Sequence, residues 1–446
     1  MAVCLTTASA ADVFTTAGDG TTYNFAALAA IEGSGVTTTE ANVFEVSQSV
    51  SIAPGDKFVC EGGITVNFAK GVEFKIQGDA DFNVAERTTF CAPDPADKTS
   101  RVHFYYNDVP DNDFVTVTNI DFNRIGVRHF GDKGMHISNC TFHKHHGKDN
   151  AAITFSKSGS SFTVVDCQFD SCQTSAIAGA ANYLNPVTME NCRLYHNTLA
   201  NRNRPQINLT CADSVIIRNC EVIGCPDNTL VGGIAVANLM GGTYGTTLIE
   251  NCYIRDNRYG ITLTGNQRGI VRNNVLIDNN KETNPMNGGS GINVTDNSQQ
   301  QVTNISGNYI EGHYWGVSII GGADIRLGKP AADDFDSPGG NVFVNNGCNG
   351  ELYDLYNNSP NTVFAQDNTW NVDEQTEEKI ETVIFHQADN PSLGLVIFMP
   401  AATTTAVNTI SREDEVPVVY NLQGLRLSGR TTKGIFIEGG KKKVVR

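Results

Sequence analysis

The stretch Ile137-Ser-Asn-Cys140-Thr-Phe142 is the first of seven copies of one six-residue phrase, which together extend to Ile310. Each copy starts with an apolar residue, carries Cys or Asn at its fourth position and ends with another apolar residue. The copies start at Ile137, Val164, Met189, Ile217, Ile249, Val271 and Ile305. Their spacing of about 22 to 34 residues is typical of supersecondary units that stack into a solenoid.

Each unit also contains a second short apolar segment, usually placed after glycine or another small residue. These segments begin at Ile153, Ile177, Ile207, Ile234, Ile261, Ile292 and Val317. The chain has 43 Gly and only 18% charged residues, which suits short strands joined by many tight turns. Helical patterns are scarce, so the sequence predicts an all-β chain.

Charge and hydropathy argue against two kinds of partner. The net charge of −16 disfavours nucleic acids, because phosphate binding requires a basic face. The chain has no run of 18 consecutive apolar residues, so no membrane span is predicted.

Twelve cysteines would ordinarily indicate disulfides in an exported protein, but the spacing of five of them argues otherwise. These five take the fourth position of successive phrases, at Cys140, Cys167, Cys192, Cys220 and Cys252. Stacking would place them in one inward column about 4.8 Å apart, where free thiols pack as small apolar groups. Asn274 and Asn308 follow at the same position and extend the column as an amide ladder. The alternatives are metal binding and redox work, and no Cys-x-x-Cys pair is present to favour a metal.

Both ends of the body carry segments that break the repeat. Residues 1–10 end in Ala8-Ser-Ala10, typical of a cleavage site, and we interpret them as the remnant of a secretory signal. Residues 23–31 are apolar and rich in Ala, which predicts a short helix that caps the solenoid body, residues 11–400. A second helical pattern covers residues 374–385, and residues 401–416 form a linker.

The last segment, residues 417–446, contains Tyr420-Asn-Leu-Gln-Gly424, then Lys433-Gly-Ile-Phe-Ile437 and a basic tail. It resembles the C-terminal sorting domain of the type IX secretion system of Bacteroidetes-type bacteria. The resemblance implies a small β domain that engages the secretion machinery and directs export to the outer cell surface. The alternative is a β-hairpin cap with a solvated tail.

The repeated phrase resembles the right-handed parallel β-helix, the pectate-lyase-like fold, over most of residues 40–372. The resemblance implies an all-β, right-handed parallel β-helix solenoid. That fold hosts pectate, chondroitin and alginate lyases, polygalacturonases and pectin esterases. It also hosts tailspikes, adhesins and proteins with no known catalysis, so it supports function only by analogy.

Alternation along the strands predicts which side chains point outward. Two positions before the column residue, successive coils carry Glu190, Arg218, Glu250 and Arg272, a ladder of opposite charges that would fix the register. One and three positions after it, Tyr lies beside Arg and carboxylates, a combination suited to sugar rings. The candidate substrate-binding residues there are Asp170, Arg193, Tyr195, Tyr253 and Arg255. A mixed solvated surface is the alternative.

The second segment of each unit presents a nearly uncharged outward line. It comprises Arg128, Thr154, Ala178, Asn208, Ala235, Thr262, Asn293 and Ser318. Without carboxylates or bases after Arg128, this line is a poor catalytic face.

Basic residues are concentrated in one part of this acidic chain, where five of the nine His lie between positions 129 and 146. A lyase acting on uronates needs a cation for the carboxylate, a base for the C5 proton and an acid for the leaving oxygen. The candidate catalytic residues are Arg128, Lys144, His145 and His146, with Arg202 and Arg204 as helpers from a nearby loop. Solvated loop residues are the alternative, and no specific lyase motif is present.

No cofactor is predicted, although Asp333, Asp334 and Asp336 could bind Ca²⁺. The sequence predicts a secreted or cell-surface monomer that acts on or binds an extracellular, acidic polysaccharide. Two classes stay open: a polysaccharide lyase or glycoside hydrolase, and a non-catalytic adhesin or glycan-binding module.

Overall fold

The chain forms two compact units, Met1–Ala402 and Thr403–Arg446. The computed structural model describes, in the first unit, residues 13–106, 114–147, 150–155, 160–179, 185–210, 214–239, 243–296, 300–328, 335 and 337–402. In the second unit it describes the backbone of four strands, which pair antiparallel: β42 (Val419–Tyr420), β43 (Arg426–Leu427), β44 (Gly434–Glu438) and β45 (Lys441–Val445). The sorting function of this unit stays a prediction, and the signal remnant lies outside the described residues.

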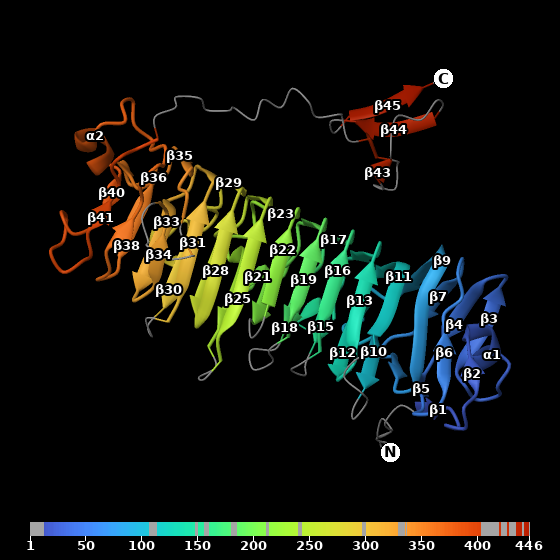
Figure 1. Ribbon diagram of the computed structural model, residues 1–446. Helices are drawn as coiled ribbons and strands as arrows, with labels where there is room; N and C mark the ends of the chain where they lie inside the picture. The colour runs from blue at the N-terminus through green and yellow to red at the C-terminus, as the bar shows by residue number, and fades with distance from the viewer. Residues whose placement is uncertain are drawn as a thin grey trace, which may run out of the picture. The chain divides into compact units, whose positions relative to one another are not determined.

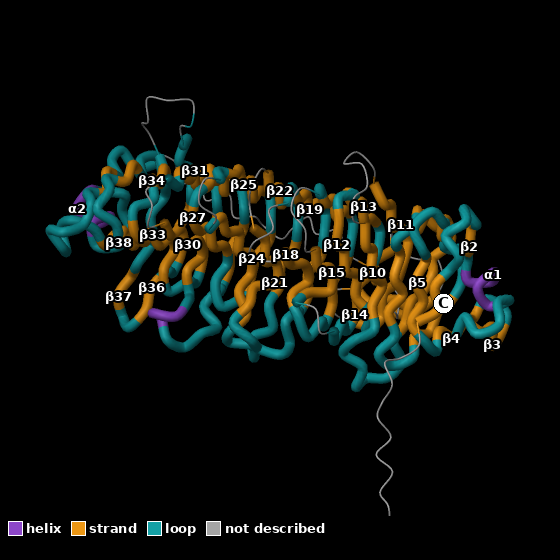
Figure 2. Tube along the Cα trace, turned by 90° about the horizontal axis from the view of Figure 1, so that it is seen from below, coloured by secondary structure: helices purple, strands orange, loops and turns teal. Residues whose placement is uncertain are grey.

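The first unit is a parallel β-helix, in which the chain winds coil by coil through three sheets of mainly parallel strands (Figures 1 and 2). The longest, sheet A, has 14 strands. In spatial order they are β1 (Val13–Thr15), β5 (Ser49–Ile52), β8 (Glu73–Ile76), β10 (Arg101–Tyr106), β12 (Gly126–Gly131), β15 (Ala151–Phe155), β18 (Ser175–Gly179), β21 (Arg204–Thr210), β24 (Val231–Asn238), β27 (Ile261–Gly265), β30 (Ser290–Asp296), β33 (Trp315–Gly321), β38 (Leu355–Asn358) and β40 (Ile384–Phe385).

The other two sheets share two long strands, β9 (Asp79–Cys91) and β11 (Phe114–Asn123), each of which bends around a corner. Sheet B adds β2 (Thr22–Tyr23), β6 (Lys57–Val59), β13 (Gly134–Ser138), β16 (Phe162–Val165), β19 (Val187–Glu190), β22 (Ser214–Arg218), β25 (Gly245–Glu250), β28 (Gln267–Arg272), β31 (Val302–Ser306), β34 (Asp324–Arg326), β39 (Val363–Phe364) and β41 (Val396–Ile397). Sheet C adds β3 (Val36–Glu40), β4 (Val43–Val46), β7 (Thr65–Phe68), β14 (Thr141–His143), β17 (Gln168–Asp170), β20 (Arg193–Tyr195), β23 (Glu221–Ile223), β26 (Tyr253–Arg255), β29 (Val275–Ile277), β32 (Tyr309–Glu311) and β35 (Val342–Val344).

Short helices and a hairpin complete the body. The predicted N-terminal helix is α1 (Phe25–Ala29), and Phe25 packs into the end of the core against Phe44, Phe58 and Phe74. The second predicted helix is shorter than expected: α2 (Glu377–Glu381) is followed by strand β40. A hairpin joins β36 (Gly347–Cys348) to β37 (Glu351–Leu352), and η1 (Pro285–Asn287) is a 3₁₀ turn. No described helix is long and apolar enough to cross a membrane.

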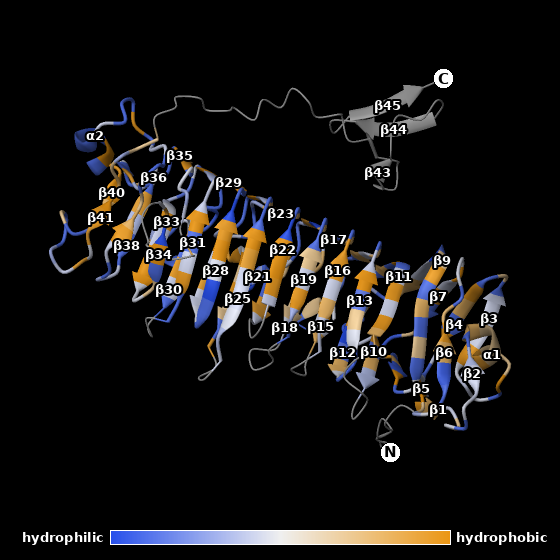
Figure 3. Cartoon of the chain, viewed as in Figure 1, coloured by the Kyte–Doolittle hydropathy of each residue, from blue (hydrophilic) through white to orange (hydrophobic). Residues whose placement is uncertain are grey.

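The repeated phrase forms the corner between sheets B and C, and its alternation of apolar and polar residues is visible along single strands (Figure 3). The residue before the column is in the left-handed region, with φ of 50° at Asn139 and 54° at Asn191, a conformation that Asn tolerates. The column residue then points inward, and the five column cysteines are 1–2% exposed free thiols. The predicted inward column is confirmed.

The amide ladder that continues this column is longer than predicted. Asn274 donates from Nδ2 to Oδ1 of Asn308 at 3.0 Å, Asn308 donates to Asn341 at 2.9 Å, and Asn341 donates to Asn368 at 2.9 Å. Each Oδ1 also accepts from the backbone N–H of the preceding member. The ladder therefore satisfies polar groups that would otherwise be buried without partners.

The charge ladder on sheet B is also confirmed. Glu190, Arg218, Glu250 and Arg272 are direct neighbours in register. Ion pairs of 2.9 Å and 2.7 Å join Arg218 to Glu190 and Arg272 to Glu250. Exposed pairs of this kind contribute only about 0–1 kcal/mol each, so their main effect is on register.

A second buried ladder runs along the corner after sheet C. Asn257 donates to Asn279 Oδ1 at 3.0 Å, and Asn279 donates to Nε2 of His313 at 3.1 Å. His313 uses Nδ1 toward Asn346 Oδ1 at 3.2 Å, and Asn346 donates to Asp354 at 3.1 Å. His313 is therefore a neutral imidazole that substitutes for an asparagine in the ladder.

Replacing His313 with Asn should reduce the acid sensitivity of the fold. Burial lowers the pKa of His313 to about 3, well below its ordinary value of about 6.5. A lowered histidine pKa contributes stability above pH 6.5 that is lost as the pH falls toward 3. Between pH 7 and pH 4 the free energy of unfolding of the parent should fall by roughly 3 kcal/mol more than that of His313→Asn. Urea unfolding at several pH values measures this difference. His136→Asn, a half-exposed site on sheet B, is the control; parallel pH profiles for the parent and His313→Asn would contradict the assignment.

Candidate functional site

Four basic side chains line one pocket at the edge of sheet A, which we call the cationic pocket. Its volume is about 180 Å³, and Lys98, His146, Arg202 and Arg204 line it together with Asn150 and Thr174. Because the strands of sheet A are parallel, the loops that precede them meet at one edge. Lys98 precedes β10, His146 precedes β15 and Arg202 precedes β21. Winding thus brings together residues that are far apart in the sequence.

The cations of this pocket have no carboxylate partner among the described residues. Arg204 donates from Nη1 to Oδ1 of Asn150 at 2.6 Å. Lys98 and Arg202 make no ion pair with a described side chain, and no described Asp or Glu lines the pocket. Within the described part of the chain, its positive charge is therefore not neutralised by a carboxylate.

The arginines predicted to face outward on sheets B and C behave differently. Arg193 pairs with Glu221 at 3.0 Å, and Arg255 pairs with Asp256 at 2.6 Å. Arg218 and Arg272 belong to the charge ladder described above. These four guanidinium groups are paired with carboxylates of the protein, whereas Arg202 has no such partner among the described residues.

His145 and His146 are adjacent in the sequence but differ in burial. His145 is 1% exposed, and its Nδ1 lies 2.8 Å from Oγ1 of Thr174 while its Nε2 accepts from the Gly147 N–H at 3.2 Å. It occupies the corner position that Asn257 and His313 occupy in later coils. The candidate catalytic role of His145 is therefore not supported, whereas His146 lines the cationic pocket. Extending the register of the repeat by a few residues would have placed His145 inside.

Arg128 and Lys144 are not brought to the cationic pocket. Arg128 is half-buried on the outer face of sheet A, in register between His103 and Thr154. Lys144 is exposed at a corner, where its backbone is in the left-handed region with φ of 55°. Of the four candidate catalytic residues, only His146 lies among the cations of the pocket, which the helpers Arg202 and Arg204 complete.

A cluster that the sequence reasoning missed lies beside Arg128. Glu73 is 2.5 Å from Nδ1 of His103 and accepts from Arg101 Nη2 at 2.9 Å. Burial acts to raise the pKa of Glu73, but the hydrogen bond from His103 and the charge of Arg101 lower it to about 2. Nε2 of His103 is buried without a hydrogen bond to a described residue. Since this nitrogen does not reach the surface, we assign the cluster no role in binding.

The Tyr and Arg face of sheet C has the predicted register, but most of its candidate side chains contact other side chains of the protein. Asp170, Tyr195, Ile223 and Arg255 follow one another across the strands. Although burial raises the pKa of Asp170, hydrogen bonds from His143, at 2.9 Å, and from Ser171 lower it overall. Tyr195 stacks on His196 with ring centroids 4.0 Å apart. Among the candidates on this face, Tyr253 alone has neither an ion pair nor a ring contact with a described residue.

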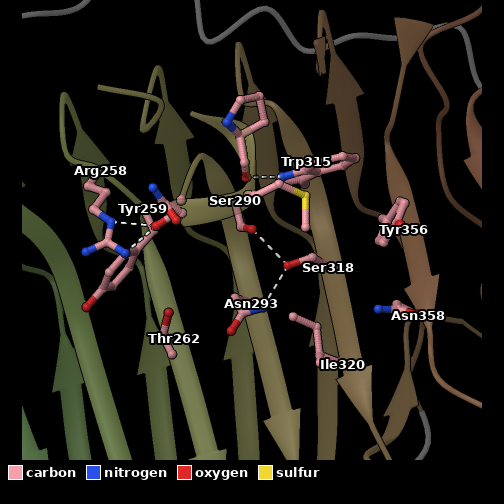
Figure 4. A pocket seen from close by; sticks show the side chains of 14 residues that line it. Arg258, Tyr259, Thr262, Ser290, Asn293, Trp315, Ser318, Ile320, Tyr356 and Asn358 are labelled. Atoms are coloured by element: carbon pink, nitrogen blue, oxygen red, sulfur yellow. Dashed lines mark hydrogen bonds between the residues drawn. The ribbon is translucent and has the colours of Figure 1, made fainter. Parts of the chain in front are cut away.

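A larger pocket, which we call the aromatic groove, lies on the outer face of sheet A over β27, β30, β33 and β38. Its volume is about 290 Å³. Figure 4 shows Arg258 and Tyr259 on one side, Trp315 and Tyr356 on the other, and Ser290, Asn293 and Ser318 between them. The uncharged line that the sequence marked as a poor catalytic face thus forms the floor of a groove. The aromatic residues come from different coils, so no local sequence motif predicts that they lie together.

The described residues offer neither a group of metal ligands nor a carboxylate in the lining of these two pockets. No described group of three His, Cys, Asp or Glu residues could hold a metal ion, and the possible Ca²⁺ ligands Asp333, Asp334 and Asp336 lie outside the described residues. Glycoside hydrolases use a pair of carboxyl groups. Neither pocket has a described Asp or Glu in its lining.

The fold of this chain is a right-handed parallel β-helix. The family model described as "Right handed beta helix region" matches residues 193–329. No curated protein sequence matches the chain.

Solved structures with a similar course of the chain include a periplasmic alginate epimerase, with 10% sequence identity, a TM-score of 0.40 and coverage of 85% of this chain and 83% of that one. A single-residue mutant of the same epimerase gives a TM-score of 0.42 at 10% identity, with coverage of 85% and 84%. An alginate lyase from Paenibacillus sp. str. FPU-7 has 14% identity and a TM-score of 0.23, with coverage of 75% of this chain and 99% of that one. Because their TM-scores are below 0.5, these matches carry no argument about this chain.

Proposed function

We propose that this protein binds an acidic polysaccharide along sheet A, with a uronate carboxylate in the cationic pocket. The observation that carries the proposal is the convergence of Lys98, His146, Arg202 and Arg204 around about 180 Å³ with no described carboxylate in the lining. A planar guanidinium matches a carboxylate with two parallel hydrogen bonds. On a chain of net charge −16, a confined cationic pocket also selects where an anionic polymer can approach.

A second candidate function is cleavage of the same polymer by β-elimination, which the position of His146 favours. Histidine is the side chain best suited to proton transfer near neutral pH. In this reaction His146 takes the C5 proton, the C4–O bond breaks with its electron pair on oxygen, and a C4–C5 double bond forms. The departing oxygen takes a proton from solvent. Arg202 and Arg204 would neutralise the carboxylate, which stabilises the carbanion at C5.

A panel of acidic polymers tests both candidates. The full chain is titrated calorimetrically with galacturonan, alginate, hyaluronan and chondroitin, and each mixture is followed by absorbance for the unsaturated product and by assay of reducing ends. Binding of at least one polymer is expected, and neutral cellulose oligomers should bind more weakly. Binding without product would assign the glycan-binding role and reject elimination. No binding to any acidic polymer would reject the proposed function.

A further inference from the structure

The floor of the aromatic groove is a set of small polar side chains held in register. Thr262 on β27 is opposite Asn293 on β30, which is opposite Ser318 on β33. Asn293 donates from Nδ2 to Oγ of Ser318 at 2.8 Å, and Ser318 is 2.8 Å from Oγ of Ser290. The floor therefore offers hydroxyl and amide groups of fixed position but carries no charge.

The aromatic wall of the groove is rigid. The indole Nε1 of Trp315 donates to the carbonyl of Pro285 at 3.0 Å. The Trp315 ring lies 4.6 Å from that of Tyr356, which itself stacks on Phe385 at 4.7 Å. Rings held in this way lose little conformational freedom when a ligand binds, which favours affinity. Met286, in the η1 turn at the rim, is 84% exposed and lines the groove.

The opposite wall carries the groove's one cation among the described residues, and that cation is already engaged. Arg258 donates from Nε to the carbonyl of Asn287 at 2.6 Å and from Nη1 to Oδ1 of Asn203 at 2.6 Å. Tyr259 beside it lies against Gly232 of the neighbouring coil, where a Cβ atom would be 2.1 Å from Cζ of its ring. Burial raises the pKa of Tyr259 to about 12, so its hydroxyl stays protonated. The donors of its one described cation are directed at carbonyl oxygens of the protein, and the rest of its described lining is uncharged, so the groove suits a hydroxyl-rich ring.

The aromatic groove and the cationic pocket share one loop. Arg202 and Arg204 line the cationic pocket, and Asn203 between them holds Arg258 of the groove. The outward line of sheet A between the two sites consists of Ala178, Asn208 and Ala235, so no large side chain interrupts it. From β21 to β33 the chain takes four coil steps, a distance of roughly 19 Å. An extended oligosaccharide can therefore reach both sites along one surface.

We propose that the aromatic groove is a second subsite, which binds an uncharged pyranose unit of the polysaccharide whose uronate occupies the cationic pocket. The sugar ring stacks on Trp315 and Tyr356, and its hydroxyls bond to Asn293 and the floor around it. This inference rests on the proposed function and adds to it. The ligand is a polymer that combines uronate with neutral units, bound along the axis of the β-helix.

Tryptophan fluorescence reports on this subsite directly. The chain has two Trp, and Trp370 is 2% exposed and stacked on Phe343 in the core, so Trp315 is the one that a ligand can reach. The full chain and the Trp315→Phe variant are titrated with octasaccharides of hyaluronan, in which glucuronate alternates with an uncharged amino sugar. Galacturonan octamers and hyaluronan disaccharides are the comparison ligands. The hyaluronan octamer should change the parent's emission and leave that of Trp315→Phe unchanged, whereas the comparison ligands should not affect Trp315.

Affinity measurements separate the subsite from the proposed function. Trp315→Ala should bind the hyaluronan octamer about 10-fold or more weakly by calorimetry, as expected for a central aromatic contact, with the disaccharide unaffected. Gly232→Ala, which pushes the Tyr259 ring outward without altering the aromatic wall, should also weaken the binding of the octamer. Octamer binding that depends on Arg202 and Arg204 but is insensitive to Trp315 and Gly232 would overturn the subsite and leave the proposed function intact. Emission changes with neutral cellohexaose and no binding of acidic polymers would support the groove and reject the proposed function. An octamer that leaves Trp315 emission unchanged at millimolar concentration would overturn the inference.

Discussion

Replacing Arg202 and Arg204 together with alanine is expected to weaken the binding of acidic polysaccharide by about 100-fold or more, because each charge-assisted contact is worth roughly 1.5–3 kcal/mol. Neither guanidinium has a carboxylate partner among the described residues, so truncation removes ligand contacts without breaking an ion pair in the fold. Calorimetric titration with the best polymer of the panel measures the effect, and the unfolding temperature should stay within a few degrees of the parent's.

The matched control is the double variant Arg218→Ala and Arg272→Ala, which removes the same charge from sheet B. These two arginines are already paired with Glu190 and Glu250. Binding should change little in this variant, since its lost charges face another side of the coil. Equal losses in both double variants would show that only net charge matters and would contradict a site at the cationic pocket. Lysine at positions 202 and 204 should recover part of the affinity, because it restores the charge without the two-pronged geometry.

Replacing Asn308 with alanine is expected to lower the free energy of unfolding by about 3–5 kcal/mol, more than any other of these changes. Its Oδ1 accepts from the backbone N–H and Nδ2 of Asn274, both at 3.0 Å, and its Nδ2 donates to Asn341 at 2.9 Å. Alanine removes the acceptor of the buried Asn274 backbone N–H and takes one bond from each neighbouring amide, and a buried group that loses its partner costs about 1–3 kcal/mol. Urea unfolding followed by circular dichroism measures the loss.

Cys220→Ala tests the same position in a coil whose column residue is a thiol. The Cys220 side chain makes a weak contact from Sγ to the carbonyl of Arg218 at 3.2 Å, so its loss should cost only about 1 kcal/mol. Because solenoid coils can unfold separately, the comparison uses the midpoint of the first transition. Equal midpoints for Asn308→Ala and Cys220→Ala would show that the amide ladder adds no stability beyond packing.

The repeated phrase was sufficient to predict most of the solenoid. It predicted the inward column at Cys140, the register between Glu190 and Arg218, and the outward line that includes Thr262. These features are periodic, and strand pairing in a solenoid copies one coil onto the next, so local alternation carries over to the whole body. The second ladder, through His313, is also periodic, and lining up the repeated units over a few more residues could have predicted it.

The candidate site was predictable only in part. Arg202, Arg204 and His146 were singled out from their charge, and the structure places all three around one pocket. Lys98, Tyr259 and Trp315 were not, because each is alone in its own coil and none repeats. Their positions depend on how each loop leaves the coil, and loop length varies from unit to unit.

The sequence by itself determined the coil, the faces of the three sheets and the buried columns, because a period of apolar residues dictates which side chains leave water. Only the tertiary structure decided that His145 is buried at a corner while His146 lines the pocket, and that Arg193 is paired while Arg202 has no carboxylate partner within the described part of the chain. It also decided that Trp315 and Tyr356 share one wall. Pairing and convergence are contacts between side chains on different coils, and such contacts are set by three-dimensional register and loop course.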